Sequence, residues 1–210
     1  MTSASKSTAV DEGGIRGVLH AVPGGASRGL VLTHGAGGDC DAPLLVALAA
    51  AFWRSGVAVL RCDLPFRQRR PKGPPSPATA EADRAGLQAA VAFMRARSPE
   101  VWLGGHSYGG RQASILAAGE PHLADRLLLL SYPLHPPDKP DQLRTGHFPD
   151  LRTPALFVHG SRDPFGSIDE MTTALALIPG DARLLTVAGA GHELARGAFD
   201  LAAVVAALAQ

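Results

Sequence analysis

A serine lies between two glycines where an apolar segment ends, in the sequence Gly105-His106-Ser107-Tyr108-Gly109. A serine hydroxyl attacks an acyl carbon when a histidine removes its proton and a carboxylate orients that histidine. The G-x-S-x-G pattern is typical of a strained turn from strand to helix that lifts the serine above a sheet edge. A plain glycine-rich turn would produce the same letters, so the pattern alone is weak evidence. The neighbouring strand and helix favour a nucleophile at Ser107.

Two later segments supply the base and the acid that such a serine needs. Asp163 follows the apolar run 154–160, and His192 follows the run 182–189. Both residues would leave a strand at the same sheet edge as Ser107, because ligands bind at the carboxyl ends of parallel strands. A turn or helix-cap role is the alternative for Asp163, and a solvated loop position is the alternative for His192. Asp138, after the run 126–134, is a second candidate acid.

Acyl transfer also needs hydrogen-bond donors where negative charge develops on the carbonyl oxygen. The backbone N–H of Tyr108, directly after the serine, is one candidate. The N–H of Ala36 is the other, in the loop "HGAGGD" that follows the run 30–35. A simple glycine-rich turn is the alternative for that loop. Neither phosphate-binding glycine motif is present in the sequence, so phosphate cradling is disfavoured.

The elements that must position these residues alternate along the chain. Apolar runs alternate with helical segments, which predicts an α/β fold with a doubly wound, mostly parallel sheet and helices on both faces. The expected strands are 17–22, 30–35, 57–66, 101–105, 126–134, 154–160 and 182–189, and the expected helices are 42–56, 80–97, 108–119, 167–178 and 197–210. We expect residues 15–210 to form a single domain, and residues 1–14 to be a flexible tail or a lead-in to an edge strand.

Composition excludes several classes of protein. The formal net charge is +1 over 210 residues, which gives no general attraction to nucleic acid or to acidic membranes. The first residues lack the apolar core of a signal peptide. The sequence contains no run of about 18 apolar residues, so we expect no membrane span. Cys40 and Cys62 do not form a disulfide framework in a domain of this size. His135 and His147 have no cluster of further ligands, so we expect no metal and no cofactor. Without a signal peptide or a membrane span, we expect a cytoplasmic location.

Four longer stretches carry a resemblance to a known family: "LTHGAGGD", "RCDLPFR", "GGHSYGGR" and "YPLHPPDKPDQLRTGHFPDL". Over about residues 15–210 the chain resembles the α/β-hydrolase superfamily. Within it, the chain looks like a small lidless branch that includes a testis-expressed protein and a subunit of the nuclear NSL acetyltransferase complex. It is similar at longer range to the dienelactone hydrolases, which carry cysteine where this chain has Ser107. The resemblance implies Ser107, Asp163 and His192 as a catalytic triad, and it implies no particular substrate.

Two loops are candidates for shaping a substrate site. The first, residues 61–72, is rich in basic side chains: Arg61, Arg67, Arg69, Arg70 and Lys72. It is either solvated surface or a site that recognises a substrate carboxylate or phosphate, with Arg67 and Arg70 as the contacts. The second loop, residues 135–153, offers His147 as a further contact. This loop is too short to build a lid domain, so we expect an open site.

The sequence therefore predicts a serine hydrolase that cleaves a small ester or related acyl compound through an acyl-enzyme. Its partner would be a small-molecule acyl substrate, with no nucleic acid and no membrane. The alternative is a binding or scaffold protein on the same fold, with little or no turnover, because a fold and a triad do not by themselves prove turnover. In at least one relative of the branch the domain serves assembly.

Overall fold

The computed structural model describes residues 7–195 and 199–210, and its centre is one eight-stranded sheet. The strand order is β1-β2-β4-β3-β5-β6-β7-β8. The strands are β1 Ser7–Glu12, β2 Ile15–His20, β3 Arg28–Thr33, β4 Ala58–Cys62, β5 Glu100–His106, β6 Arg126–Leu130, β7 Ala155–Gly160 and β8 Ala182–Val187. β1 and β2 pair antiparallel with their neighbours, and the strands from β4 to β8 in this order run parallel to one another. The fold class predicted from the sequence is confirmed.

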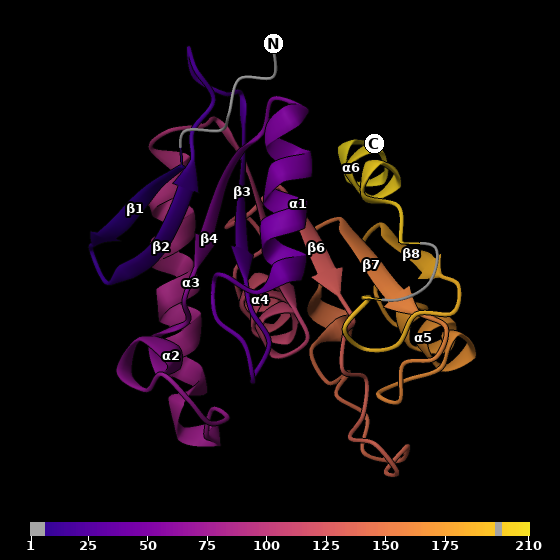
Figure 1. The fold of residues 1–210 in the computed structure, drawn as a ribbon. Coiled ribbons are helices and arrows are strands. Elements are labelled where there is room, and N and C mark those ends of the chain that lie inside the picture. The colour runs from indigo at the N-terminus through magenta and orange to yellow at the C-terminus, as the bar shows by residue number, and fades with distance from the viewer. Residues whose placement is uncertain (1–6, 196–198) are drawn as a thin grey trace.

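Helices cover both faces of the sheet. They are α1 Pro43–Arg54, α2 Pro65–Arg69, α3 Ala80–Arg95, α4 Tyr108–Gly119, α5 Ile168–Leu175 and α6 Leu201–Ala209, with short 3-10 turns at Pro77–Thr79 and Phe148–Asp150. α1 and α6 lie on the face nearer the viewer in Figure 1, and α3 and α4 lie behind the sheet. Each face has its own apolar core, one with α1 and α6 and one with α3, α4 and α5. No helix in the described ranges is long and apolar enough to cross a membrane.

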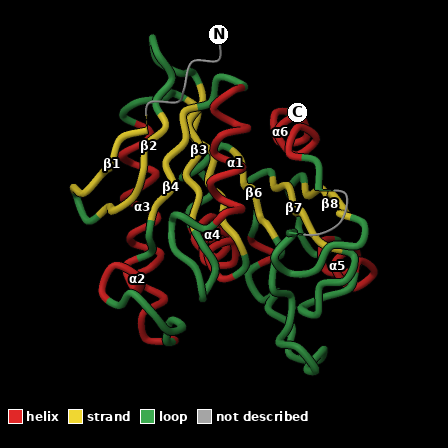
Figure 2. The backbone as a smooth tube through the Cα atoms, viewed as in Figure 1, coloured by secondary structure: helices red, strands yellow, loops and turns green. Residues whose placement is uncertain are grey.

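The burial of the central strands explains their composition. All residues of β4 and β7 are buried, and so are all but the first residue of β3, β5 and β6. Strands covered on both faces must be apolar nearly throughout, which is why they lack the alternation of a half-exposed strand. β1, at the sheet edge, is exposed at every residue but Val10. The arrowheads of the parallel strands point to the lower edge of the molecule in Figure 1, where loops, green in Figure 2, follow the strands.

The expected flexible tail is wrong for residues 7–12, which form β1. This strand pairs antiparallel with β2 through a turn at Gly13 and Gly14, whose φ values of 59° and 77° suit glycine. β1 is mostly polar, so its composition does not distinguish it from a tail. Residues 1–6 of the expected tail lie outside the described residues. So do residues 197–198 of the expected last helix, which begins in the structure at Leu201.

Of the expected strands that end early in the structure, two end four residues before the expected position. The expected strand 57–66 stops at Cys62, because Pro65 has no N–H for the sheet and instead begins α2. The first turn of α2 is held by the Asp83 carboxylate, which accepts from the Phe66 N–H at 2.9 Å. The expected strand 126–134 stops at Leu130, since Ser131 has a φ of 47° that no strand residue adopts.

Candidate active site

Ser107 lies on a sharp turn between β5 and α4. Its φ of 50° and ψ of −113° are strained for a residue with a side chain, and its N–H donates to the Leu130 carbonyl at 2.8 Å. The flanking glycines are required by close approach. A Cβ on Gly109 would lie 2.5 Å from the His34 carbonyl oxygen, and a Cβ on Gly105 would lie 2.7 Å from the Gly109 backbone. The turn predicted from the G-x-S-x-G pattern is therefore present in the structure.

A chain of hydrogen bonds joins the three residues that the sequence singled out. The Ser107 hydroxyl lies 2.8 Å from His192 Nε2, and His192 Nδ1 lies 2.9 and 3.0 Å from the two Asp163 oxygens. With His192 neutral, Nδ1–H donates to Asp163 and Nε2 accepts from Ser107. The Asp163 side chain is fully buried and also accepts from the Phe165 N–H at 2.9 Å. The structure brings these three residues together, and Asp163 rather than Asp138 meets the histidine.

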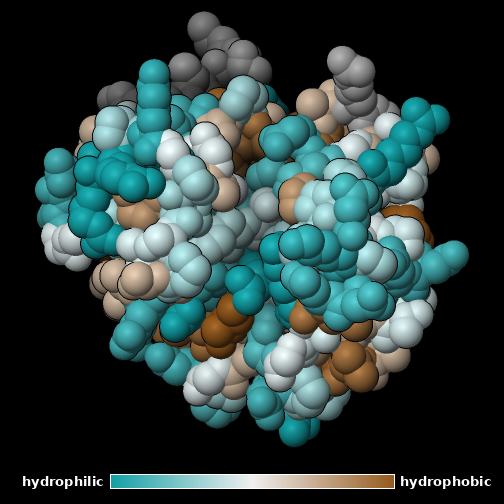
Figure 3. All heavy atoms as spheres, turned by 90° about the horizontal axis from the view of Figure 1, so that it is seen from below, coloured by the Kyte–Doolittle hydropathy of each residue, from teal (hydrophilic) through white to brown (hydrophobic). Residues whose placement is uncertain are grey.

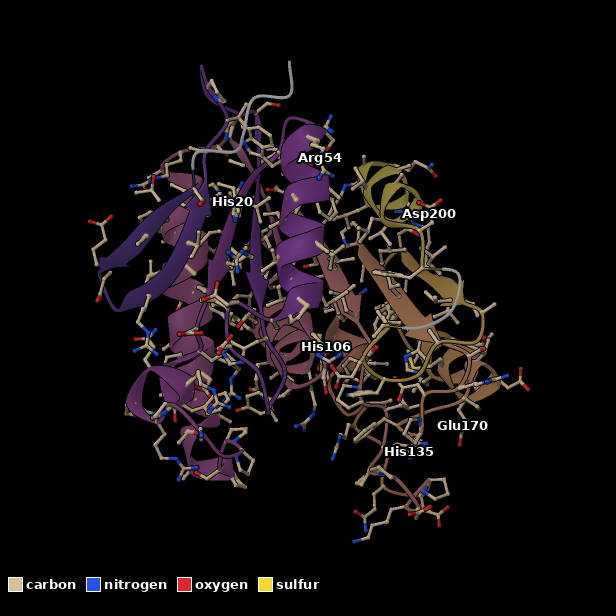
Figure 4. The ribbon with its side chains drawn as sticks, in the orientation of Figure 1. His20, Arg54, His106, His135, Glu170 and Asp200 are labelled. Carbon is tan, nitrogen blue, oxygen red and sulfur yellow. The ribbon has the colours of Figure 1, made fainter. Side chains whose placement is uncertain are left out.

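Aromatic rings fix the orientation of His192. The Phe165 ring lies 4.2 Å from the His192 ring, centroid to centroid, and the His106 ring lies 5.2 Å away on another side. His106 is at the carboxyl end of β5 (Figure 4), and its Nε2 lies 2.9 Å from the His192 carbonyl oxygen. Burial is the main cause that lowers the pKa of His106, so it is a neutral donor to that carbonyl. Sequence reasoning missed this role, although His106 adjoins the serine.

The loop after β3 provides the candidate oxyanion donors. Its Gly35 carbonyl accepts from His34 Nδ1 at 2.8 Å and from the Gly38 N–H at 3.2 Å. Ala36 lines the same cavity as Ser107. Tyr108 is the first residue of α4, so its N–H has no partner within the helix. Ala36 therefore lies at the same cavity as Ser107, and Tyr108 follows Ser107 directly at the start of α4.

A cavity of about 930 Å³ opens at Ser107 and His192. Its apolar lining includes Leu44 of α1, Phe199 just before α6, and Leu201 at the start of α6. The charged side chains among its described lining residues, apart from histidines, are the exposed carboxylates of Asp39 and Glu193. Seen from this edge of the sheet, the surface is mostly hydrophilic with separate hydrophobic patches (Figure 3). The volume suits a small-molecule ligand.

The three residues expected to bind substrate do not line this cavity. Arg67 is buried and bonded to backbone carbonyls, and Arg70 donates to the Pro74 carbonyl at 3.0 Å. His147 Nε2 lies 2.8 Å from the Ser114 hydroxyl, on the far side of α4. These placements correct the expectation of a substrate site built from them. The physical reason is that Arg67 and His147 are bonded to other groups of the protein, while Arg70 is exposed and bonded to the neighbouring Pro74 carbonyl.

The other side chains considered as metal ligands or nucleophiles are the histidines, the carboxylates and two cysteine thiols. Within the described part of the chain, no set of three or more His, Cys, Asp and Glu residues is arranged to hold a metal ion. Cys40 and Cys62 are buried free thiols. Burial, followed by the nearby Asp63 carboxylate, raises the pKa of the Cys40 thiol to about 12, so it stays protonated at neutral pH. Neither thiol is a candidate nucleophile.

The parallel sheet, the serine turn and the order serine, acid, histidine along the chain define the α/β-hydrolase class. The sequence profile of the alpha/beta hydrolase domain family matches residues 26–200. The chain therefore belongs to the alpha/beta hydrolase family, as its sequence motifs indicated.

Solved structures share the fold over nearly the whole chain. A dienelactone hydrolase from Anabaena variabilis is 21% identical with a TM-score of 0.74, and the match covers 98% of this chain and 95% of that one. Est1E from Butyrivibrio proteoclasticus is 18% identical with a TM-score of 0.73, covering 98% and 96%. A lidless α/β serine hydrolase from Xanthomonas campestris is 19% identical with a TM-score of 0.69, covering 99% and 93%. These likenesses show that the chain has the α/β-hydrolase fold over nearly its whole length.

Proposed function

We propose that the protein is a serine hydrolase that cleaves small esters or related acyl compounds. The observation that carries the proposal is the continuous hydrogen-bond chain from the Ser107 hydroxyl through His192 to Asp163. Such a chain activates a hydroxyl that is otherwise a poor nucleophile. It lies at the end of a cavity large enough for a small acyl compound, and it stands on a fold whose members include hydrolases.

The geometry supports the following sequence of steps. Ser107 Oγ attacks the carbonyl carbon while His192 Nε2 takes its proton, and Asp163 holds the imidazole in the required tautomer. The amides of Ala36 and Tyr108 stabilise the negative charge on the carbonyl oxygen. The C–O bond of the ester then breaks, and the leaving alcohol takes the proton from His192. Water, activated by the same histidine, hydrolyses the acyl-enzyme and restores Ser107.

The cavity favours neutral substrates with apolar groups. Its wall from α1 and the start of α6 is apolar, and its two carboxylates, Asp39 and Glu193, repel an anionic group. The basic residues that suggested an anionic substrate lie elsewhere, since Arg67 is buried and Arg70 faces the 70–75 loop. We therefore propose neutral esters rather than carboxylate- or phosphate-bearing ones.

Turnover of p-nitrophenyl esters of increasing acyl length tests the function. We expect the wild type to hydrolyse the shorter esters and Ser107→Ala to lose roughly 10⁴- to 10⁶-fold in kcat. Ser76→Ala removes an exposed hydroxyl far along the chain from the elbow, and it should match the wild type. A wild type without turnover on any ester, or a Ser107→Ala variant as active as Ser76→Ala, would favour the binding or scaffold role instead.

A further inference from the structure

Arg67 is a buried cation whose hydrogen-bond partners are all backbone carbonyls. Only 3% of the surface of Arg67 is exposed to solvent. Nε donates to Gly38 at 2.8 Å, Nη2 donates to Ala36 at 2.9 Å and to Gly73 at 3.1 Å, and Nη1 donates to Arg70 at 3.2 Å. Among the ion pairs of the described residues, none includes Arg67. A buried charge without a carboxylate partner is costly, so its place calls for an explanation.

Fastening the 67–73 loop explains only part of this arrangement. The bonds to Arg70 and Gly73 tie that loop to its own start. The bonds to Ala36 and Gly38 reach a different segment, the oxyanion loop, which we define as residues 35–38. A neutral side chain could cap one carbonyl, but the planar guanidinium holds two peptides of the oxyanion loop at once.

Peptide geometry converts these bonds into a direction for the loop amides. In a trans peptide the C=O and the following N–H point in opposite directions. Arg67 holds the Ala36 carbonyl, so the Gly37 N–H points away from the guanidinium. The Gly35 carbonyl is held by His34 and by the Gly38 N–H, so the Ala36 N–H likewise points away from them. Ala36 and Gly37 both line the cavity that holds Ser107.

The loop itself has little preference for this conformation. Three of its four residues are glycines, which have a wide choice of backbone conformations, and a Cβ on Gly37 would meet nothing within 4 Å. A clamp from outside the loop supplies the missing order. The positive charge behind the Ala36 carbonyl also polarises that peptide group, and preorganised dipoles of this kind stabilise developing negative charge.

We propose that Arg67 is a positioning residue that holds the oxyanion loop through its Ala36 and Gly38 carbonyls and places positive charge behind the peptide whose Gly37 amide lies at the cavity. Arg67 does not touch the substrate. It therefore supports the transition state, where the oxygen carries charge, more than the bound ester. This inference rests on the hydrolase function proposed for Ser107.

Steady-state kinetics of three variants test the inference. We expect Arg67→Met to lower kcat by roughly 10²- to 10³-fold, as loss of an oxyanion donor does, with KM changed less than about 3-fold. Arg67→Lys should fall between, because one ammonium cannot span both carbonyls. Arg70→Met is the matched control, since its exposed side chain donates to the Pro74 carbonyl and not to the oxyanion loop, and it should match the wild type. A rise in KM at unchanged kcat in Arg67→Met, or no effect at all, would overturn the proposal.

A backbone measurement keeps the test independent of turnover and of whether Arg67→Met folds. In ¹⁵N-labelled protein, Arg67→Lys should shift the Ala36 and Gly37 amide resonances and speed their hydrogen exchange, while Arg70→Met leaves both unchanged. Unaltered Ala36 and Gly37 amides in Arg67→Lys would show that the clamp does not exist. If Ser107 proves unreactive but these amides move, the hydrolase proposal fails and the clamp stands.

Discussion

The segments that follow β4 and β8 leave the sheet at the same edge and put their polar residues to opposite uses. After β8, His192 turns into the cavity and meets Ser107. After β4, Asp63 accepts from the Cys40 N–H at 2.8 Å and from Arg16 at 3.0 Å, while Arg67 holds backbone carbonyls. One segment contributes chemistry, and the other fixes the backbone that surrounds it.

The strand order accounts for the difference. β7 and β8 lie on the β6 side of β5, where the loops that follow them meet in front of Ser107. β4 is separated from β5 by β3, so the oxyanion loop, which follows β3, leaves the sheet between the β4 segment and Ser107. Charged residues after β4 therefore reach the back of that loop rather than the cavity. The number of charges near a sheet edge does not show which side of a loop they occupy.

The largest expected effect is a loss of turnover when the acid that orients His192 is changed. Asp163→Asn should lower kcat by about 10⁴-fold, because the imidazole loses its orienting acceptor, with the fold retained. Asp138→Asn is the control, since Asp138 lies in the 135–147 loop away from His192. If ester kinetics show that Asp138→Asn lowers kcat more than Asp163→Asn does, the role given to the cavity side is wrong.

In the segment after β4, a change of aspartate to asparagine should lower the free energy of unfolding rather than turnover. Asp63→Asn removes a buried carboxylate that binds Arg16 and the Cys40 N–H, so we expect the free energy of unfolding to fall by about 1.5–3 kcal/mol. Urea unfolding followed by circular dichroism measures this, and kcat should stay within a few fold. If Asp63→Asn stops turnover without loss of stability, the two segments do not differ as described.

The site was more predictable from sequence than its surroundings. The serine turn, Asp163 and His192 each follow an apolar run, and the chain order sets their place at one edge, so local pattern was enough. Arg67 could not be placed in this way, because its burial depends on carbonyls 29 and 31 positions away. β1 was missed since a polar edge strand has the composition of a tail, and its order comes from pairing with β2, from burial of Val10 and from the ion pair between Glu12 and Arg97.

A smaller effect concerns pH, through a histidine outside the cavity. Burial, followed by the nearby Arg111, lowers the pKa of His147 to about 4, although Asp150 opposes this. The unfolded chain therefore binds this proton first as the pH falls. The contribution to stability is complete above about pH 6.5 and is lost as the pH falls toward 4. His147→Gln should show a shallower loss of urea stability between pH 7 and pH 5 than the wild type.

The control for this measurement is His122→Gln, at an exposed histidine. It should keep the pH dependence of the wild type. If His147→Gln shows the same loss of stability as His122→Gln, then burial and Arg111 do not lower the pKa of His147 in the folded protein.

The smallest expected effect is on substrate charge. Asp39→Asn combined with Glu193→Gln should reduce the preference for a neutral butyrate ester over a hemisuccinate ester by roughly 2- to 10-fold in kcat/KM, because exposed charges interact weakly. The effect should shrink in high salt. Arg69→Ala combined with Arg70→Ala, outside the cavity, should leave the ratio unchanged. If the arginine variant changes the ratio and the carboxylate variant does not, substrate recognition belongs to the β4 segment.

Covalent labelling tests the nucleophile most directly. The purified protein is treated with a fluorophosphonate, and intact mass and peptide mapping locate the adduct. We predict one adduct per chain on Ser107, no adduct in Ser107→Ala, and normal labelling in Ser76→Ala. Equal labelling of Ser107→Ala, or an adduct on another serine, would contradict the proposal that Ser107 is an activated nucleophile.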